Sequence, residues 1–355
     1  MNIVAPPMLS RPDQDDLATL MSVRGLCVSI LVSTSPGPRL SEPDRQRVQA
    51  HARDVLRRLE LEPDQGQAAV LAARMRTAVD RAFRMPADAA LAIYVADATI
   101  RVFHLPMKVE DRVVIDPTFA TRDLVRAVQS NPQFLLLHLD HRSASLFRYN
   151  QKYLQPQLTP DFPALREGRV RTGRDLEQQR RFLRAVDAGL GRHLTQNPLP
   201  VVLVGGERIL GEYRHGSRIA GMARGIHSRP ALTELENIGR SVMADHVADL
   251  SAAAHDTLQA RLRARQAVTG LLGCWHAAAT GDPELLVVEQ HFAMPVRIVA
   301  DGRYVEPSDD EEHPDVIDDA VDELIEKVLQ RGGHVSVVPD GTLVEHGRVA
   351  LTRTR

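Results

Sequence analysis

The chain has 355 residues, of which 43% are hydrophobic, 25% charged and 4% aromatic, and its formal net charge is −2. This composition is that of a soluble globular protein, and it excludes a disordered chain, a membrane-spanning chain and a uniformly basic nucleic-acid binder. The length predicts two or three domains. We expect three, over residues 1–130, 131–250 and 251–355.

The cysteines and the first residues bear on the cell compartment. The N-terminal residues carry neither a basic leader nor a long apolar core, so we expect a cytoplasmic protein. Cys27 and Cys274 are the only cysteines, and one pair without metal-ligand spacing predicts neither a disulfide framework nor a zinc site. We expect both to be buried apolar side chains. We also expect no metal, no cofactor and no membrane partner.

The first part of the chain has the pattern of an α/β domain. Apolar runs predict its strands, and apolar residues three and four positions apart predict its helices. In chain order these are a strand at 26–33, helices at 42–59 and 67–83, two strands within 91–105, a strand at 113–116 and a helix at 121–129.

The pattern restarts at residue 131. The segment FLLLHLDHRSASLFRYN, residues 134–150, predicts a strand, a polar turn and a second strand, and YLQPQ extends this meander before a polar loop. A helix at 176–193 follows. VVLVGGERIL then supplies an apolar strand, a glycine turn and a helix, and IAGMARGIH supplies one more strand. This order predicts a mixed sheet with helices on both faces.

The last part begins with helices across residues 230–279. The strands ELLVVEQHF and VRIVADGRYVE follow, and the acidic stretch EPSDDEEHPD leads into a helix with apolar residues from Ile317 to Val328, for which Pro314 lies in the first turn. Gly332 and Gly333 end that helix. The strand HVSVVP, a Pro-Asp-Gly turn and a final strand complete an α/β/α domain of about 100 residues.

Asp140 stands at the end of the first strand of the meander, where a metal-dependent nuclease carries a carboxylate. Such chemistry needs two to four clustered acidic side chains, because the metal ions must be held against phosphate repulsion. We find no partners for Asp140, so we interpret it as a turn residue and His138 and His141 as ordinary neighbours. Gly205-Gly206 lacks the further residues of a nucleotide-binding loop, which favours close packing of a strand against a helix.

A locally basic segment, residues 166–184, is the strongest functional candidate. Its arginines can neutralise several RNA phosphates, although a solvated helix with internal ion pairs explains the pattern about as well. The candidate RNA contacts are Arg166, Arg169, Arg171, Arg174, Arg180 and Arg181. The cluster Arg261, Arg263 and Arg265 is smaller, and we interpret it as solvated surface. The acidic run 309–319 reads as a solvated loop, with a docking patch as the alternative.

The order of these parts resembles a known superfamily. The meander, the polar loop, the helix, VVLVGGERIL, the long helical connection, ELLVVEQ and the ending ELIEKVLQRGGHVSVVPDGTLVEHGRVAL are similar to the bacterial branch of the archaeo-eukaryotic class 1 release factor and Pelota superfamily. The resemblance covers residues 131–355. It implies an RNase H-like central domain without nuclease carboxylates and a C-terminal domain that resembles the kink-turn-binding ribosomal proteins.

The resemblance also locates the part of the chain where peptide-releasing members carry a Gly-Gly-Gln motif. That loop corresponds to residues 155–180, which contain LREGRVRTGRDLEQQ and no Gly-Gly-Gln. Gly173 with Gln178 or Gln179 does not reproduce the spacing. We therefore expect no catalytic residues, and the resemblance favours a binding protein over an enzyme, as in Pelota, which also lacks the motif.

Together these features predict a cytoplasmic translation factor that binds ribosomal or transfer RNA, in rescue or in hibernation by occupying the A site. A translational GTPase is a candidate partner. Two alternatives stay open. The first is a hydrolase, either a peptidyl-tRNA hydrolase using Gln178 or Gln179 or a metal-dependent nuclease using Asp140. The second is a regulatory module whose acidic segment 309–319 docks a partner protein.

Overall fold

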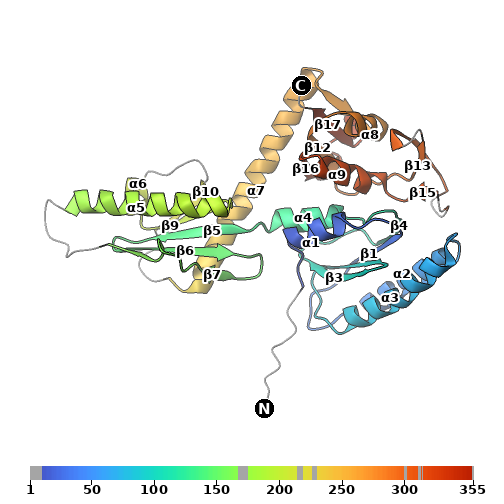
Figure 1. Cartoon of the computed structure of the whole chain (residues 1–355), viewed down its shortest axis with the longest axis horizontal. Helices are drawn as coiled ribbons and strands as arrows, with labels where there is room; N and C mark the ends of the chain where they lie inside the picture. The colour runs from blue at the N-terminus through green and yellow to red at the C-terminus, as the bar shows by residue number, and fades with distance from the viewer. Residues whose placement is uncertain are drawn as a thin grey trace, which may run out of the picture. The chain divides into compact units, whose positions relative to one another are not determined.

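The computed structural model describes residues 10–166, 175–213, 219–225, 230–299, 302–310, 313 and 315–353. The chain forms two compact units (Figure 1). One unit combines Met1–Val128 with Ser251–Arg355, and we call it the two-part unit. The other is the central unit, Gln129–Leu250. In the described residues no helix is long and apolar enough to cross a membrane.

The N-terminal half of the two-part unit is an antiparallel sheet covered by helices on both faces. The strand order is β3-β2-β1-β4. Even-numbered residues of β1, such as Ile30, pack with α2 and α3, whereas Leu31 packs with Leu20 of α1 and Leu124 of α4. The elements are α1 (Gln14–Met21), β1 (Cys27–Ser33), α2 (Glu42–Leu59), α3 (Gln65–Phe83), β2 (Ala90–Ala96), β3 (Thr99–Leu105), β4 (Arg112–Asp116) and α4 (Arg122–Ser130).

The C-terminal half contains a four-stranded sheet, β11-β17-β12-β16, and a smaller sheet, β14-β13-β15. Strand β17 pairs with both β11 and β12 and therefore lies inside the sheet. Strands β12 and β16 are parallel. The elements are β11 (Ala267–Thr269), α8 (Leu271–Thr280), β12 (Pro283–Glu289), β13 (Val296–Val299), β14 (Tyr304–Pro307), β15 (Val316–Ile317), α9 (Ala320–Gln330), β16 (His334–Val338), the 3-10 turn η2 (Val344–His346) and β17 (Val349–Arg353).

Two predicted helices of this half have different bounds in the structure. Helix α9 begins at Ala320, because the Asp319 side chain accepts a hydrogen bond from the Val321 N–H and caps the helix, while Ile317 pairs with β13 instead. Pro314 lies outside the described residues. The helical stretch predicted across residues 230–279 is interrupted, because strand β11 precedes α8 and Gly270 turns the chain with a φ of 74°.

The two halves share a hydrophobic core. Val125 of α4 is buried in the cluster formed by α8, α9 and β12, and Leu17 of α1 packs against the same cluster. Cys27 and Cys274 are free and buried, and burial raises the pKa of each thiol to about 12. Both cysteines are therefore packing residues, as the sequence predicts. The division of the chain into three domains stays a prediction.

Buried charges join the same two halves. The Arg112 guanidinium lies 2.6 Å from an Asp319 carboxylate oxygen, and Arg122, which is fully buried, pairs with Asp319 and donates its backbone N–H to Asp322 at 2.8 Å. Asp123 lies 3.3 Å from Arg112 and extends the network. We call this group of five residues the buried ion-pair network. A buried charge is tolerated when it is paired and hydrogen-bonded, and here each one is.

A second set of contacts fixes the segment before α9. Asp318 accepts from the Arg58 guanidinium at 2.7 Å and from the Ile115 N–H at 2.9 Å. The Asp116 carboxylate in turn accepts a hydrogen bond from the Asp318 backbone N–H at 2.7 Å. The end of the acidic run 309–319 is therefore not a solvated loop, because it docks on the N-terminal half of its own chain.

The central unit is built on one mixed sheet in the order β10-β9-β5-β6-β7, with β8 pairing β6. Strands β5, β6 and β7 form an antiparallel meander, and β9 and β10 run parallel to β5. This is the arrangement that the RNase H-like prediction requires. The strands are β5 (Phe134–Leu139), β6 (Ser143–Tyr149), β7 (Leu154–Pro156), β8 (Ala164–Leu165), β9 (Val201–Gly205) and β10 (Ile219–Arg224).

Helices cover both faces of this sheet. Leu135 and Leu137 pack with α5 (Asp175–Gln196) and α6 (Glu207–Glu212), whereas Phe134 and Leu136 pack with the first half of α7 (Leu232–Arg263). Strand residues alternate between faces, so one apolar run serves both layers. Figure 1 shows α5 running along the sheet. The predicted multidomain α/β fold with a mixed central sheet is confirmed.

Candidate nucleic-acid interface

The basic segment leaves the central sheet beside the turn between β5 and β6. Strand β8 pairs with the start of β6, and the Arg166 N–H donates to the Arg142 carbonyl at 2.8 Å. One Arg166 guanidinium nitrogen lies 3.5 Å from the His141 carbonyl oxygen. The backbone of Arg166 is therefore anchored, and its half-buried side chain lies next to the exposed turn residues His141 and Arg142.

Three of the predicted contacts, Arg169, Arg171 and Arg174, lie outside the described residues. The described parts of the chain nevertheless define both ends of the segment that carries them. The described residues that flank them are Arg166, next to strand β8, and Asp175, where α5 starts.

Arg180 and Arg181 lie on the exposed side of the first turns of α5. Arg181 and Arg184 both pair with Glu177, at 3.3 Å and 3.7 Å, and these side chains are 75%, 72% and 54% exposed. Exposed ion pairs contribute about 0–1 kcal/mol, and salt screens them. One carboxylate thus serves two guanidinium groups in a weak arrangement, which leaves these arginines available to phosphate at little energetic cost.

The opposite side of the same helix turns toward the sheet. Phe182, Leu183 and Val186 are buried against β5 and β9. The helix is therefore held by apolar packing, and its charged side does not have to stabilise the fold. Gln178 is exposed, whereas Gln179 is buried and its side-chain Nε2 has no hydrogen-bond partner among the described residues.

Asp140 behaves as a turn residue. One of its carboxylate oxygens accepts from the His141 N–H at 2.7 Å, and its own N–H donates to the Ser143 carbonyl at 2.8 Å. Within the described residues, no three His, Cys, Asp or Glu side chains are grouped so that they could hold a metal ion. His138 is buried, and burial lowers the pKa of its imidazole although Asp140 opposes the shift.

Gly205 is explained by a close approach between strands. A Cβ at Gly205 would lie 2.5 Å from the Leu139 carbonyl oxygen of β5, whereas a Cβ at Gly206 would meet nothing within 4 Å. The tight contact is therefore between two strands, and not between a strand and a helix as the sequence suggested. This close approach explains Gly205 without a phosphate-binding role.

The turn residues His141 and Arg142 were not predicted as part of this site. Each is an isolated polar residue in a hairpin turn, and such turns are polar for structural reasons. Only the pairing of β8 with β6 brings them next to Arg166. No pattern local in the sequence carries that information.

One protein family has a model that matches residues 133–281, from β5 to the end of α8. It is the bacterial archaeo-eukaryotic release factor family 3. The match contains all six predicted arginine contacts, and it confirms the resemblance predicted from the sequence. No curated protein matches the chain in sequence.

The chain also aligns with solved structures of Pelota and of a translation termination factor over most of their lengths. A model of ribosome-bound archaeal Pelota and ABCE1 is 12% identical, with 98% of this chain and 96% of that chain covered and a TM-score of 0.45. Archaeal translation termination factor aRF1 is 15% identical, with 97% and 99% covered and a TM-score of 0.28. Pelota from Archaeoglobus fulgidus is 14% identical, with 74% and 79% covered and a TM-score of 0.30.

Proposed function

We propose that this protein is a translation factor that binds the ribosome through RNA contacts of its central unit and does not release the peptide. The observation that supports it most is the match of residues 133–281 to a release factor family, because that stretch contains the basic segment at the end of the central sheet. The arginines at the two described ends of the segment are anchored by backbone contacts or by apolar packing of their helix.

The absence of peptide release in this proposal rests on the sequence. The chain contains no Gly-Gly-Gln. Gln178 is exposed on α5 and Gln179 is buried against the sheet, so neither residue lies on a glycine-rich backbone that could enter a narrow catalytic centre. The role that follows is occupancy of the A site, in rescue of stalled ribosomes or in hibernation. A translational GTPase is the protein partner we would look for first.

Co-sedimentation with ribosomes over a range of salt concentrations tests this proposal. The variant in which Arg166, Arg169, Arg171 and Arg174 all become Glu should lose most of its binding. The wild-type affinity should fall steeply with salt, and the slope of log affinity against log salt should be smaller in the variant by about 3, since each lost phosphate contact removes about 0.7.

A matched control carries four Arg→Glu changes at exposed positions outside the central unit. These positions are Arg53, Arg76, Arg101 and Arg263. The control has the same net charge as the test variant, so it should bind the ribosome much more tightly if the contacts are local. Equal loss in both variants, or no co-sedimentation of the wild type at low salt, would contradict the proposal.

Peptide release distinguishes the proposal from the hydrolase alternative. Ribosomes that carry a labelled peptidyl-tRNA should keep their peptide when the protein is added. Release that disappears in Gln178→Ala or Gln179→Ala would instead establish a hydrolase. RNA cleavage that disappears in Asp140→Asn would establish a nuclease.

A further inference from the structure

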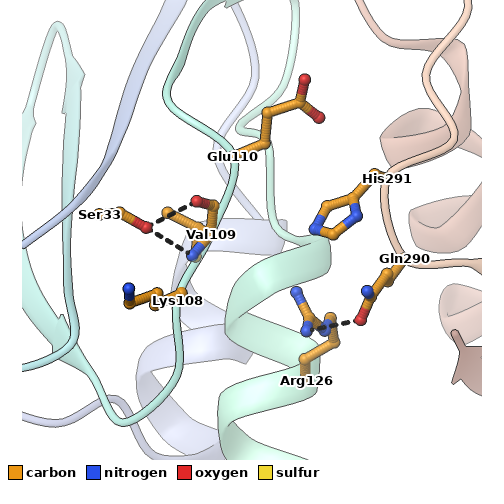
Figure 2. Close-up of a pocket in the computed structure, with 7 residues that line it drawn as sticks. All are labelled: Ser33, Lys108, Val109, Glu110, Arg126, Gln290 and His291. Carbon is orange, nitrogen blue, oxygen red and sulfur yellow. Dashed lines mark hydrogen bonds between the residues drawn. The ribbon is translucent and has the colours of Figure 1, made fainter. Parts of the chain in front are cut away.

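A pocket of about 480 Å³, lined in part by charged and amide side chains, lies in the two-part unit (Figure 2). Its N-terminal wall contains Lys108 and Glu110, from the loop between β3 and β4, and Arg126 of α4. Its C-terminal wall contains Gln290 and His291, which directly follow β12. The Arg126 guanidinium donates to the Gln290 side-chain oxygen at 3.0 Å and links the two walls.

The loop that carries Lys108 and Glu110 is held in place by its neighbours. The Ser33 hydroxyl donates to the Val109 carbonyl at 2.7 Å and accepts from the Val109 N–H at 3.1 Å (Figure 2). Asp111 accepts from the Ser33 N–H at 2.6 Å. Val109 is buried while Lys108 and Glu110 are exposed on either side of it. A positive and a negative side chain therefore extend from a fixed backbone, and such preorganisation lowers the entropic cost of binding.

The C-terminal wall stands at the carboxyl ends of the parallel pair β12 and β16. Ligands of α/β sheets bind outside the carboxyl ends of parallel strands. Asp340, which follows β16, accepts from the backbone N–H of His291 at 3.2 Å, and its carboxylate lies 2.6 Å from His291 Nδ1. That contact fixes the ring and leaves Nε2 as the ring nitrogen that can contact a ligand.

The charges of the pocket fit a ligand with two kinds of polar group. Arg126 uses two guanidinium nitrogens for Asp123 and Gln290, and the five N–H groups of an arginine leave others for an anion. Lys108 adds a second cation. Glu110 repels an anion but accepts hydrogen bonds from hydroxyl groups, and the Gln290 amide can donate or accept.

The geometry points to a binding site for a small phosphate ester that also carries hydroxyl groups, such as a sugar phosphate or a mononucleotide. Lys108 and Arg126 bind the phosphate, and Glu110 accepts from a hydroxyl. The volume exceeds what a single phosphate ion fills and lies within the range of small-molecule sites. A continuous RNA backbone fits less well, because Glu110 would face its phosphates. The inference does not depend on ribosome binding.

Calorimetric titration of the full chain with ribose 5-phosphate, adenosine monophosphate, adenosine and inorganic phosphate tests the site. The two phosphate esters should bind, and adenosine should not. Lys108→Ala should weaken binding of the esters about tenfold, the loss expected for one charge-assisted contact. Lys152→Ala is the matched control, because Lys152 is an exposed lysine of the central unit, and it should bind as the wild type does.

Glu110→Ala separates the proposed site from simple attraction of anions. This variant should bind inorganic phosphate more tightly and ribose 5-phosphate less tightly than the wild type, because it loses a repulsive charge and a hydroxyl acceptor together. The proposal is overturned if neither ester binds at millimolar concentration. It is also overturned if Lys108→Ala binds like the wild type, or if a short RNA competes for the pocket better than the esters do.

Discussion

The two units of this protein use charge in opposite ways. In the two-part unit Arg112 and Arg122 are inside the fold and are neutralised by Asp319, Asp322 and their neighbours. In the central unit the core is apolar on both faces of the sheet, and charged pairs such as Arg181 with Glu177 lie at the surface. Arginine content alone therefore does not indicate a partner. What matters is whether carboxylates within the fold already neutralise the arginines.

This comparison also decides between two interpretations of the acidic segment. Asp318 and Asp319 are bound by Arg58, Arg112 and Arg122 of the same chain. Their carboxylates are not free to dock a second protein. A regulatory module that docks a partner through this segment would therefore have to do so without Asp318 and Asp319.

Removing Arg122 should have the largest effect on stability. Arg122→Ala leaves Asp319 and Asp322 buried with one partner fewer, and breaking a buried ion pair costs about 3–5 kcal/mol. Hydrogen exchange should show faster opening in residues 10–128 and 251–353, with little change in the central unit. The control Arg57→Ala removes a pair with Asp54 in which both side chains are more than a third exposed, and it should cost about 0–1 kcal/mol. If Arg122→Ala leaves the stability unchanged, the network does not join the two halves.

Removing apolar volume should weaken the central unit in turn. Leu137 of β5 is fully buried against α5, so Leu137→Ala should cost about 2–5 kcal/mol. Hydrogen exchange should now rise in residues 129–250. Leu158 is 82% exposed, and Leu158→Ala should stay within about 0.5 kcal/mol of the wild type. If Leu137→Ala also speeds hydrogen exchange in the two-part unit, the two units do not have separate cores.

A smaller effect is expected where the central strands come closest. Gly205→Ala places a Cβ against the Leu139 carbonyl oxygen and should cost about 1–3 kcal/mol, measured by urea unfolding. Gly206→Ala changes the next residue in the same way but meets open space. It should leave stability within about 1 kcal/mol of the wild type. Equal costs would show that the close approach of β9 and β5 is not what requires glycine.

The smallest effect concerns pH. Burial lowers the pKa of His138 in the folded state, so the unfolded chain takes up a proton first as the pH falls below about 6.5. Stability of the central unit should therefore decrease on acidification. His138→Leu should show a smaller drop in melting temperature between about pH 7.5 and about pH 5.5 than the wild type. The exposed neighbour His141 provides the control, since His141→Leu should show the same drop in melting temperature as the wild type.

The sequence predicts the elements of the sheets well, because apolar runs such as residues 134–139 reflect burial on both faces. It does not predict the buried ion-pair network. Arg122 and Asp319 are 197 positions apart, and each has the charge of an ordinary surface residue. The same limit applies to the pocket, whose Arg126 and Gln290 are 164 positions apart. The apolar spacing predicts a start of α9 that is too early, because the short strand β15 at Val316–Ile317 interrupts a spacing that continues without a break in the sequence.

A cryo-EM map of ribosomes with this protein bound tests the central claim most directly. The account predicts that residues 166–181 of the central unit lie against RNA phosphates, with Arg180 and Arg181 facing the backbone. It also predicts that the buried ion-pair network stays closed inside the two-part unit. A map in which the segment 166–181 faces solvent while another surface contacts the ribosome would contradict it.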